Sequence, residues 1–368
     1  DLEEKTCNLD EAIKFDVNDE QKYNLHFING VYELNTGKFR ERVYGDYVTV
    51  GNSVNTWNFN LNERNEELIE EVKNDFRKVQ PRKEQLTFML EWMAYCLSGD
   101  TSRCLMKFNI GLRASNGKTT EFNIHQQVFP KLIKNVAKDY FKDNFEKRHK
   151  FKIDLIQRPI RCVYIEELDE KRLDAGELKD AVDGKNQNCD VMYGTNVEGS
   201  FQCKFNFLGQ KEPVIKEDEG ILRRGVLQNY TSKFTDLVKE DNWDELLFPK
   251  ILNFEYKYKE EEFKNAYLHL LLDNYKGNSF KVPKECAENF TNHIQDINED
   301  RDLVDMFQDS HANDWISKKQ ISILISKNMI ATKNFMKEYF PMSKYDKNKM
   351  IDGEKGCYNK IMKKAESV

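Results

Sequence analysis

The sequence predicts an α/β fold organised around a candidate phosphate-binding loop. A short apolar run at 104–110 leads into small and polar residues, and Gly117-Lys118-Thr119 then opens a helical stretch. A second apolar run, 161–165, ends directly in two carboxylates, Glu166 and Glu167. Because the carboxyl ends of parallel strands meet at one edge of a sheet, we expect these carboxylates to lie beside the loop.

The length and composition indicate a multidomain protein without membrane spans. The chain has 368 residues, which suggests two or three domains, and its 33% charged and 39% hydrophobic residues are a soluble, globular balance. It has no apolar run of membrane-spanning length and no signal peptide, so we expect an intracellular protein. The chain begins with Asp1 rather than Met, and we expect it to be a piece of a longer polypeptide.

The net charge, the cysteines and the histidines indicate which kinds of binding site to expect. The net charge of −6 does not favour general nucleic-acid binding, so any such contact needs locally basic loops or a basic module. None of the eight cysteines falls in a Cys-x-x-Cys pair, which indicates reduced thiols packed as small hydrophobes. The six histidines are dispersed, so we expect no zinc site.

The N-terminal part is predicted to be a small α+β domain, residues 1–99. An Asn29-Gly30 turn between two short apolar runs favours a β-hairpin. A further strand is expected over 44–50, and apolar residues at helical spacing predict two helices, 64–79 and 84–97.

The remainder is predicted to be a nucleotide-binding core, residues 100–280, and a C-terminal module, residues 281–368. The core carries the strand at 104–110 and the loop, while 129–160 shows no clear period. Strands are predicted at 161–167, 191–193, 201–208 and 225–229, and helices at 119–128, 177–182, 243–252 and 260–275. The C-terminal module reads as helical and charged, with helices at 302–307, 318–326 and 332–339 and a basic tail at 344–364.

The loop residues suit a bound phosphate chain. Backbone N–H groups at a helix N-terminus point at an anion, which the helix dipole also attracts. Lys118 would reach the β and γ phosphates, and the Thr119 hydroxyl would hold Mg²⁺. An ordinary helix start is the alternative interpretation of an isolated Gly-Lys-Thr. The expected nucleotide-binding residues are Ala114, Ser115, Asn116, Gly117, Lys118, Thr119 and Thr120.

Three further elements follow the loop in the order that an ATPase needs. One of the two glutamates would hold Mg²⁺ through water, and the other would orient the attacking water, unless they only begin a solvated charge run. Gln210 follows a predicted strand and could approach the γ-phosphate. Arg224 precedes another strand and could reach a phosphate in a neighbouring subunit, although paired arginines also serve as surface ion pairs.

This ordered set resembles the motifs of a superfamily 3 helicase, closest to the poxvirus-type primase-helicases of large DNA viruses, phages and plasmids. The resemblance covers most of the chain and rests on 115–119, 165–167, Leu178-Lys179, Asp183-Gly184, 201–210 and 218–224, with 27–37 similar to the domain before the helicase. It implies an AAA+-like core that binds ATP and Mg²⁺, a hexameric ring and a winged-helix tail. The ring would move on DNA at a replication fork, in the host cytoplasm or at a viral replication site.

The resemblance also implies roles for individual residues and partners. It assigns Glu166 to the metal and Glu167 to the water, and it makes the hairpin 193–201 the pore loop. The family's primase domain, which precedes the helicase, is absent from this chain, so a linked primase or other replication proteins are expected partners. Leu112 and Ala114 stand where the family prefers glycines, and Gln210 replaces its usual asparagine.

Candidate DNA contacts are few near the pore loop. The hairpin tip contains Asn196 but no lysine, which leaves Lys179, Lys185 and Lys204 as available phosphate contacts. Each could equally be a solvated lysine. The tail offers basic residues interleaved with aromatics, which suit backbone and stacking contacts as well as a plain charged surface. They are Lys344, Tyr345, Lys347, Lys349, Lys355, Tyr358, Lys360, Lys363 and Lys364.

The sequence therefore predicts an ATP-dependent DNA helicase or translocase. The alternative from another class is a DNA-binding or assembly module whose degenerate loop binds nucleotide poorly, and Leu112, Ala114 and Gln210 favour it. A different phosphate-loop enzyme, such as a kinase, fits less well because no acceptor pocket is evident.

Overall fold

The chain forms two compact units, Asp1–Asn292 and His293–Val368, which are described separately. The computed structural model describes residues 21–111, 114–141, 148–166, 173–189, 197–216, 218–305, 307–309, 315–324, 332, 336–337, 340, 343–351, 353–359 and 361–363. Helix α9 (Lys284–Asp305) contains the point at which the two units divide. Among the described residues, none of the helices combines the length and the apolar character needed to cross a bilayer.

The first unit begins with a small sheet in the order β3-β2-β1-β4. Strands β1 (Asn24–Phe27) and β2 (Gly30–Glu33) form the predicted hairpin and pair in antiparallel fashion. Strand β3 (Lys38–Arg40) extends it antiparallel to β2, and the two-residue β4 (Val54–Asn55) runs parallel to β1. A 3-10 turn, η2 (Gln21–Tyr23), precedes the sheet.

The strand predicted over 44–50 is wrong. That segment contains a 3-10 turn, η3 (Tyr44–Asp46), and the start of α1 (Val50–Ser53). The buried Asp46 carboxylate accepts the Val43 N–H at 2.8 Å and pairs with both terminal nitrogens of Arg40. These contacts fix a turn that the β-type sequence pattern does not indicate.

The centre of the unit is a five-stranded parallel sheet in the order β11-β5-β10-β7-β6. The predicted strands form β5 (Met106–Ile110), β7 (Cys162–Ile165), β10 (Lys204–Gly209) and β11 (Gly225–Asn229). Strand β6 (Ile133–Asn135) was not predicted. The α/β fold with a parallel sheet is thus confirmed.

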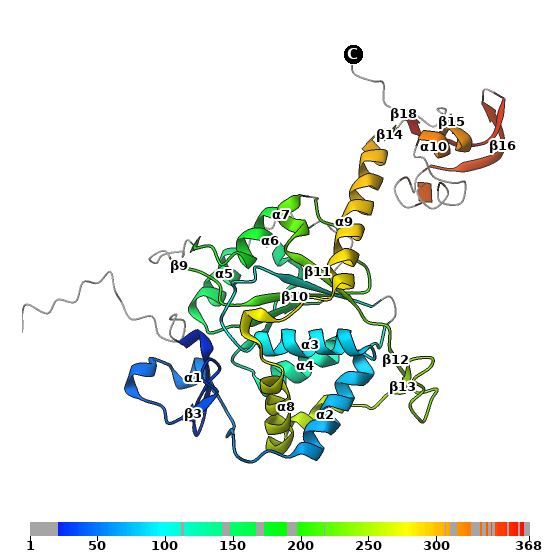
Figure 1. The fold of residues 1–368 in the computed structure, drawn as a ribbon. Helices are drawn as coiled ribbons and strands as arrows, with labels where there is room; N and C mark the ends of the chain where they lie inside the picture. Colours follow the sequence, from blue (N-terminus) through cyan, green and yellow to red (C-terminus); the bar gives the residue numbers. More distant parts are fainter. Residues whose placement is uncertain are drawn as a thin grey trace, which may run out of the picture. The chain divides into compact units, whose positions relative to one another are not determined.

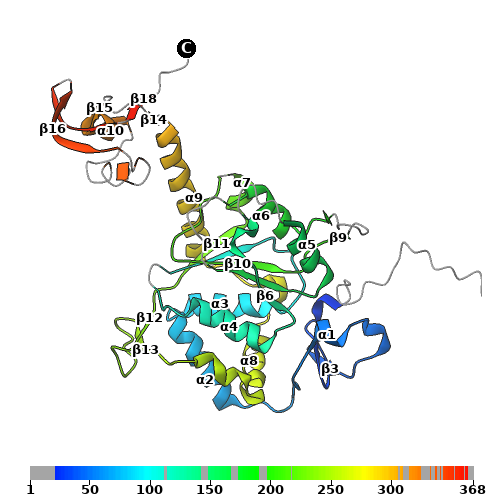
Figure 2. The ribbon, with the colours of Figure 1, turned by 180° about the vertical axis from the view of Figure 1, so that it is seen from behind.

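Helices cover both faces of this sheet (Figures 1 and 2). Helices α3 and α4 lie on one face, with α2 and α8 beyond them, and α6 and α7 lie on the other. The predicted helices appear as α2 (Glu66–Val79), α3 (Lys83–Tyr95), α4 (Lys118–Val128), α6 (Ala175–Val182) and α8 (Glu261–Asp273). This unit also contains two further α-helices and three 3-10 helices. They are α5 (Arg148–Gln157), α7 (Glu219–Leu222), η4 (Lys138–Phe141), η5 (Phe254–Lys259) and η6 (Gly277–Ser279).

The two faces of the sheet differ in chemistry. On one face the Phe108 ring stacks on Phe207 and on Phe290, with centroid distances of 4.8 and 5.2 Å. On the face under α3, several strand residues are polar and fully buried, among them Asn206 and Gln228. There the Trp92 indole N–H donates to Asn206 Oδ1 at 2.7 Å, and Gln228 Nε2 donates to the Gln85 carbonyl at 2.8 Å. Such pairing is required because a buried polar group without a partner is costly.

The helix predicted over 243–252 is wrong. The segment instead provides β13 (Leu247–Pro249), which pairs in parallel with β12 (Lys233–Thr235). Leu246 and Asn253 flank it with φ values of 55° and 54°, and Pro249 lacks the N–H that a helix interior needs. Strands β8 (Gln187–Cys189) and β9 (Val197–Gly199) form an antiparallel hairpin, while the predicted strand 191–193 lies outside the described residues.

The second unit is a small mixed module. Strand β17 (Glu354–Asn359) pairs with β15 (Trp315–Ser317) and β16 (Tyr345–Ile351), and β14 (Phe307–Asp309) pairs with β18 (Ile361–Lys363). Helix α10 (Lys318–Leu324) corresponds to the helix predicted over 318–326. The basic tail is therefore largely a set of strands, and β16 is exposed along most of its length. The helix predicted at 332–339 lies mostly outside the described residues.

Candidate functional site

The candidate phosphate loop, residues 111–117, joins the carboxyl end of β5 to the start of α4. Residues 112 and 113 lie outside the described part, and Gly111 N–H donates to the Gly209 carbonyl at 3.1 Å. Ser115 and Gly117 adopt left-handed backbone angles, with φ of 59° and 86°. Left-handed residues before a helix turn successive N–H groups toward one side, which is the geometry of an anion-binding concavity.

Neighbouring segments hold this loop in place. The Phe234 N–H donates to the Ser115 carbonyl at 2.7 Å, so the segment after β11 closes over the loop. A Cβ atom at Gly117 would lie 2.8 Å from Val79 Cγ2 and 3.1 Å from Phe234 Cε2. Both the backbone angle and the space at position 117 therefore require glycine.

Lys118 is the first residue of α4 and is only 9% exposed. Its ammonium nitrogen lies 3.4 Å from Asn116 Oδ1, and burial lowers the pKa of the lysine. Within the described residues, no carboxylate pairs with this cation. A buried cation without an opposite charge is unfavourable, so a bound anion would stabilise it. Of the other predicted loop contacts, Ala114, Ser115 and Thr119 are exposed and Thr120 is partly buried.

The acidic and amide residues lie at the same edge of the sheet as the loop. Strand β10 lies between β5 and β7, so Gln210 and Glu166 follow the two strands next along from the loop strand. Gln210 is exposed, and Glu166 Oε2 accepts a hydrogen bond from Asn135 Nδ2 at 3.1 Å. Glu167 lies outside the described residues. The structure thus brings Lys118, Gln210 and Glu166 to one edge.

A pocket of about 330 Å³ opens beside the loop. Its apolar wall includes Val79, Phe234, Leu252 and Phe254, and it reaches Ser115, Gly117 and Thr120. Lys250 lines this pocket and also an adjoining one that contains Ala114 and Lys233. The sequence analysis missed this pocket because one wall comes from the segment misread as a helix, and the only signal was its cluster of apolar residues at 248–254.

Arg224 lies at the opposite edge of the sheet. It immediately precedes β11, whose first residue, Gly225, pairs with Met106 at the start of the loop strand. A five-residue strand at about 3.3 Å per residue separates the two edges by roughly 16 Å. Arg224 therefore cannot reach the loop of its own chain without a large movement.

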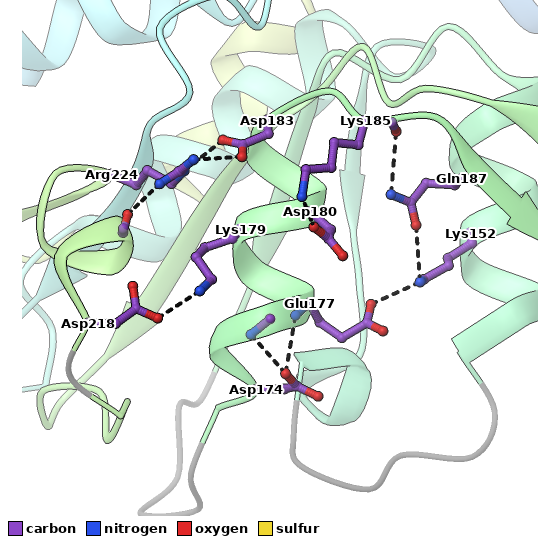
Figure 3. Close-up of polar contacts among 12 residues, drawn as sticks. Lys152, Asp174, Glu177, Lys179, Asp180, Asp183, Lys185, Gln187, Asp218 and Arg224 are labelled. Carbon is purple, nitrogen blue, oxygen red and sulfur yellow. Dashed lines mark hydrogen bonds and ion pairs between the residues drawn. The ribbon is translucent and has the colours of Figure 1, made fainter.

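Arg224 forms an ion pair within its own chain (Figure 3). Its Nε and Nη2 atoms each donate to one Asp183 oxygen at 2.6 Å, and Nη1 donates to the Gly220 carbonyl at 2.7 Å. The Arg224 hydrogen bond lowers the pKa of Asp183, and Asp183 raises the pKa of Arg224. The predicted role of Arg224 in a neighbouring site needs this pair to open.

The predicted DNA contacts have different surroundings. Lys179 pairs with Asp218 at 2.7 Å, and Lys185, two residues before β8, pairs with Asp180 at 2.5 Å (Figure 3). Lys204 is 3% exposed, donates to the Ser98 carbonyl and lies 4.7 Å from the centre of the Tyr95 ring. This placement argues against a DNA contact by Lys204, which instead belongs to the core. Asn196 lies outside the described residues.

The predicted Mg²⁺ site, with Thr119 and Glu166, stays a prediction. Over the described ranges, no group of three or more His, Cys, Asp or Glu side chains is placed to hold a metal ion. Thr119 would be a direct ligand of a Mg²⁺ that Glu166 holds through water, and phosphate oxygens and further waters would complete a donor set that Mg²⁺ commonly takes. The hydroxyl and the carboxylate fit that chemistry, and both belong to the loop edge of the sheet.

Comparison with known proteins gives structural neighbours only. Neither a protein-family model nor a curated protein matches the chain. Among solved structures, the apo NrS-1 C-terminal region (305–718) matches with 13% identity and a TM-score of 0.44, over 95% of each chain. The A form of the apo NrS-1 C-terminal region matches with 12% identity and a TM-score of 0.42, over 80% of this chain and 75% of that one. Likenesses at this level support no conclusion about activity.

Proposed function

We propose that the chain is an ATPase that uses Mg²⁺-ATP to move on DNA, as a helicase or translocase of the superfamily 3 type. The observation that carries this proposal is the convergence of a buried Lys118 without an acidic partner, the exposed Gln210 and Glu166 at one edge of a parallel sheet. Ligands of open α/β sheets bind at the carboxyl ends of the strands. A phosphate chain would supply the negative charge that Lys118 lacks.

Each residue has a separate task in this proposal. The loop backbone and Lys118 hold the phosphates, and Thr119 with Glu166 holds Mg²⁺, which would neutralise charge on the phosphate oxygens. Glu167 orients the attacking water, and Gln210 donates its amide to the γ-phosphate. Asn135 donates to Glu166 and so fixes the direction of that carboxylate.

The pocket beside Gly117 favours a nucleotide over free phosphate. Its volume of about 330 Å³ and its mixed wall of Val79, Phe234 and Leu252 with polar residues suit a base and a ribose. Because it opens directly beside the loop, a nucleotide could place its base there and its phosphates at Lys118.

The position of Arg224 supports a ring. It lies at the edge of the sheet away from its own loop, roughly 16 Å distant, so an active role in phosphate chemistry requires a second subunit. In a closed ring, the amino edge of one sheet would face the carboxyl edge of the next.

A DNA-binding or assembly module with a weak nucleotide site remains the second candidate. One structural observation favours it, because in the isolated chain Asp183 and the Gly220 carbonyl accept the hydrogen bonds of the Arg224 guanidinium. In that case the arginine is structural, and the chain binds DNA without turning over ATP.

The test is ATP turnover with and without single-stranded DNA, together with a mass measurement of the assembly. Lys118→Ala should lower turnover roughly a hundredfold or more while the protein stays folded, because one electrostatic contact to the transition state is lost. Lys38→Ala, an exposed lysine on β3, is the matched control and should not change turnover. DNA binding without turnover supports the second candidate, and equal turnover in Lys118→Ala contradicts the assignment of the site.

A further inference from the structure

Helix α6 contacts the turn at 218–224 through two ion pairs of opposite polarity (Figure 3). Lys179 Nζ lies 2.7 Å from Asp218 Oδ2, and one helical turn later Asp183 accepts two of the three hydrogen bonds that Arg224 donates. Asp218 also caps α7 by accepting the Ile221 N–H at 2.8 Å. The two pairs together fasten α6 to the segment that carries Arg224.

The same helix leads directly into the hairpin β8–β9. Asp183 is the C-cap of α6, Gly184 follows with φ of 62°, and β8 begins at Gln187. A side-chain contact continues the connection, because Asn186 Nδ2, just before β8, donates to Glu198 Oε1 on β9 at 2.6 Å. A displacement of α6 would therefore move the hairpin with it.

Asp183 takes the Nε–Nη2 edge of the Arg224 guanidinium in this conformation. Its side chain is 9% exposed, and three of its N–H groups are already bonded to Asp183 and to the Gly220 carbonyl. A planar guanidinium offers five N–H donors in a fixed geometry, so bidentate binding of a phosphate through Nε and Nη2 needs Asp183 to be released. If a phosphate replaces Asp183, the Arg224 cation keeps a negatively charged partner. If Arg224 left Asp183 with no phosphate present, its charge would have no partner.

We propose that Asp183 is a positioning residue that holds Arg224 in a resting state, and that Arg224 leaves it for the phosphate of a neighbouring subunit. The exchange removes one of the two ion pairs that join α6 to the turn 218–224 and so loosens the helix and, through it, the hairpin β8–β9. The inference rests on the proposed ATPase function and adds the link between the nucleotide and the hairpin. Because coupling between sites is reciprocal, a ligand that displaces the hairpin also favours release of Arg224.

The direct test is the steady-state kinetics of Asp183→Asn with and without single-stranded DNA. This variant removes the carboxylate charge and should leave the KM for ATP unchanged. Its kcat without DNA should rise several-fold, because Arg224 no longer has to leave a charged partner, and stimulation by DNA should shrink correspondingly. Asp180→Asn makes the same chemical change on the same helix, where the carboxylate pairs with Lys185 rather than an arginine, and it should retain wild-type stimulation at saturating DNA.

Any other pattern overturns the inference. A kcat as low as that of Arg224→Ala would mean that Asp183 only orients the arginine, and unchanged stimulation would mean that the pair is structural. Asp183→Glu keeps the charge and should keep the stimulation. If wild-type protein forms no ATP-hydrolysing assembly, the proposed function fails as well, and this outcome is distinct from a wild-type ATPase whose stimulation is insensitive to Asp183.

A second measurement does not depend on turnover. Melting temperatures of wild type, Asp183→Asn, Arg224→Lys and the double variant form a cycle that reports the coupling of the two residues. We expect non-additive shifts without nucleotide and additive shifts with Mg²⁺ and a non-hydrolysable ATP analogue. Equal coupling in both conditions would show that Arg224 stays on Asp183 and would overturn the exchange.

Discussion

The Nδ1 atom of His125 lies 2.7 Å from the hydroxyl oxygen of Tyr267, and this contact joins α4, the helix opened by the candidate phosphate loop, to α8. Both side chains are completely buried. Burial lowers the pKa of His125 to about 3, so the ring stays neutral in the folded protein. The position of α4 therefore depends on a histidine that cannot accept a proton without loss of stability.

We predict that His125 makes the protein sensitive to acid. In the unfolded chain its pKa is near 6.5, so below that pH the unfolded state takes up a proton that the folded state does not. Stability should fall as the pH drops from about 6.5 toward 3, by at most about 5 kcal/mol from this group. Urea unfolding at several pH values should show a shallower acid limb for His125→Gln. Tyr267→Phe, which removes only the hydroxyl, should lower stability without changing that slope, and an unchanged slope in His125→Gln would contradict the prediction.

Gly117→Ala should destabilise the loop and weaken nucleotide binding. The residue has φ of 86°, and a Cβ atom would meet Val79 Cγ2 at 2.8 Å. A non-glycine residue at such an angle costs about 1–3 kcal/mol before the clash is counted. Gly51→Ala is the control, because Gly51 is in a helix and a Cβ atom there would have no neighbouring atom within 4 Å. This variant should unfold at the same urea concentration as the wild type or a higher one. Equal stability of the two variants would show that the loop is not held as described.

Lys204→Met should change the alkaline limb of stability and leave DNA binding alone. Burial lowers the pKa of Lys204 to about 8, so between about pH 8 and 10.5 the unfolded chain binds more protons and wild-type stability rises with pH. The stability of the variant relative to wild type should therefore fall by up to about 3 kcal/mol across this interval. Unfolding curves at both ends of the interval measure the difference. A loss of DNA affinity in the folded variant would contradict this prediction and would support a contact between Lys204 and DNA.

Sequence reasoning located elements whose pattern is local. Strand β11 follows from an apolar run bounded by Arg224 and polar residues, and α2 follows from apolar residues at helical spacing. Strand β6 has only three residues and becomes a strand because β7 pairs with it, which is a tertiary effect. The buried strand residues Asn206 and Gln228 also defeat hydrophobic patterning, because their partners, Trp92 and Gln85, come from a distant helix.

In the candidate site, too, some features follow from local sequence and others depend on contacts between distant segments. A general rule about the carboxyl ends of parallel strands was enough to place Glu166 and Gln210 beside the loop. The pairing of Arg224 with Asp183 spans 41 residues and leaves no signal in either segment alone. The pocket beside Gly117 depends on β12–β13, where one proline and two left-handed residues decide against the expected helix.

Lysines on the exposed strand β16 should contribute to DNA binding by the second unit. Lys347 and Lys349 are exposed, and Lys349 Nζ also lies 5.3 Å from the centre of the Trp315 ring. If each contacts a phosphate, replacing both by alanine should lower affinity for all sequences and reduce the salt slope by about 2. Fluorescence anisotropy over a salt series measures both quantities. Replacing Lys73 and Lys83, two exposed lysines on α2 and α3, removes the same charge and should leave the slope unchanged. Equal slopes for the two double variants would exclude β16 from the DNA interface.

If the proposed ring forms, Arg224→Ala should bind ATP normally and hydrolyse it poorly, because the arginine would act on a neighbouring subunit. Its position at the amino edge of the sheet places it roughly 16 Å from its own loop, and such an arginine is worth about a thousandfold or more in rate. Lys118→Ala is inactive for a different reason, since it lacks the cation at the loop. In mixed rings, some interfaces pair an intact Lys118 with an intact Arg224 from the next subunit, so turnover should partly return when the two inactive variants are combined. Mixing Arg224→Ala with Gly117→Ala should do the same, because that defect also lies at the loop. If the subunits exchange and no ratio restores turnover, Arg224 does not act between subunits, and its pair with Asp183 is its whole role.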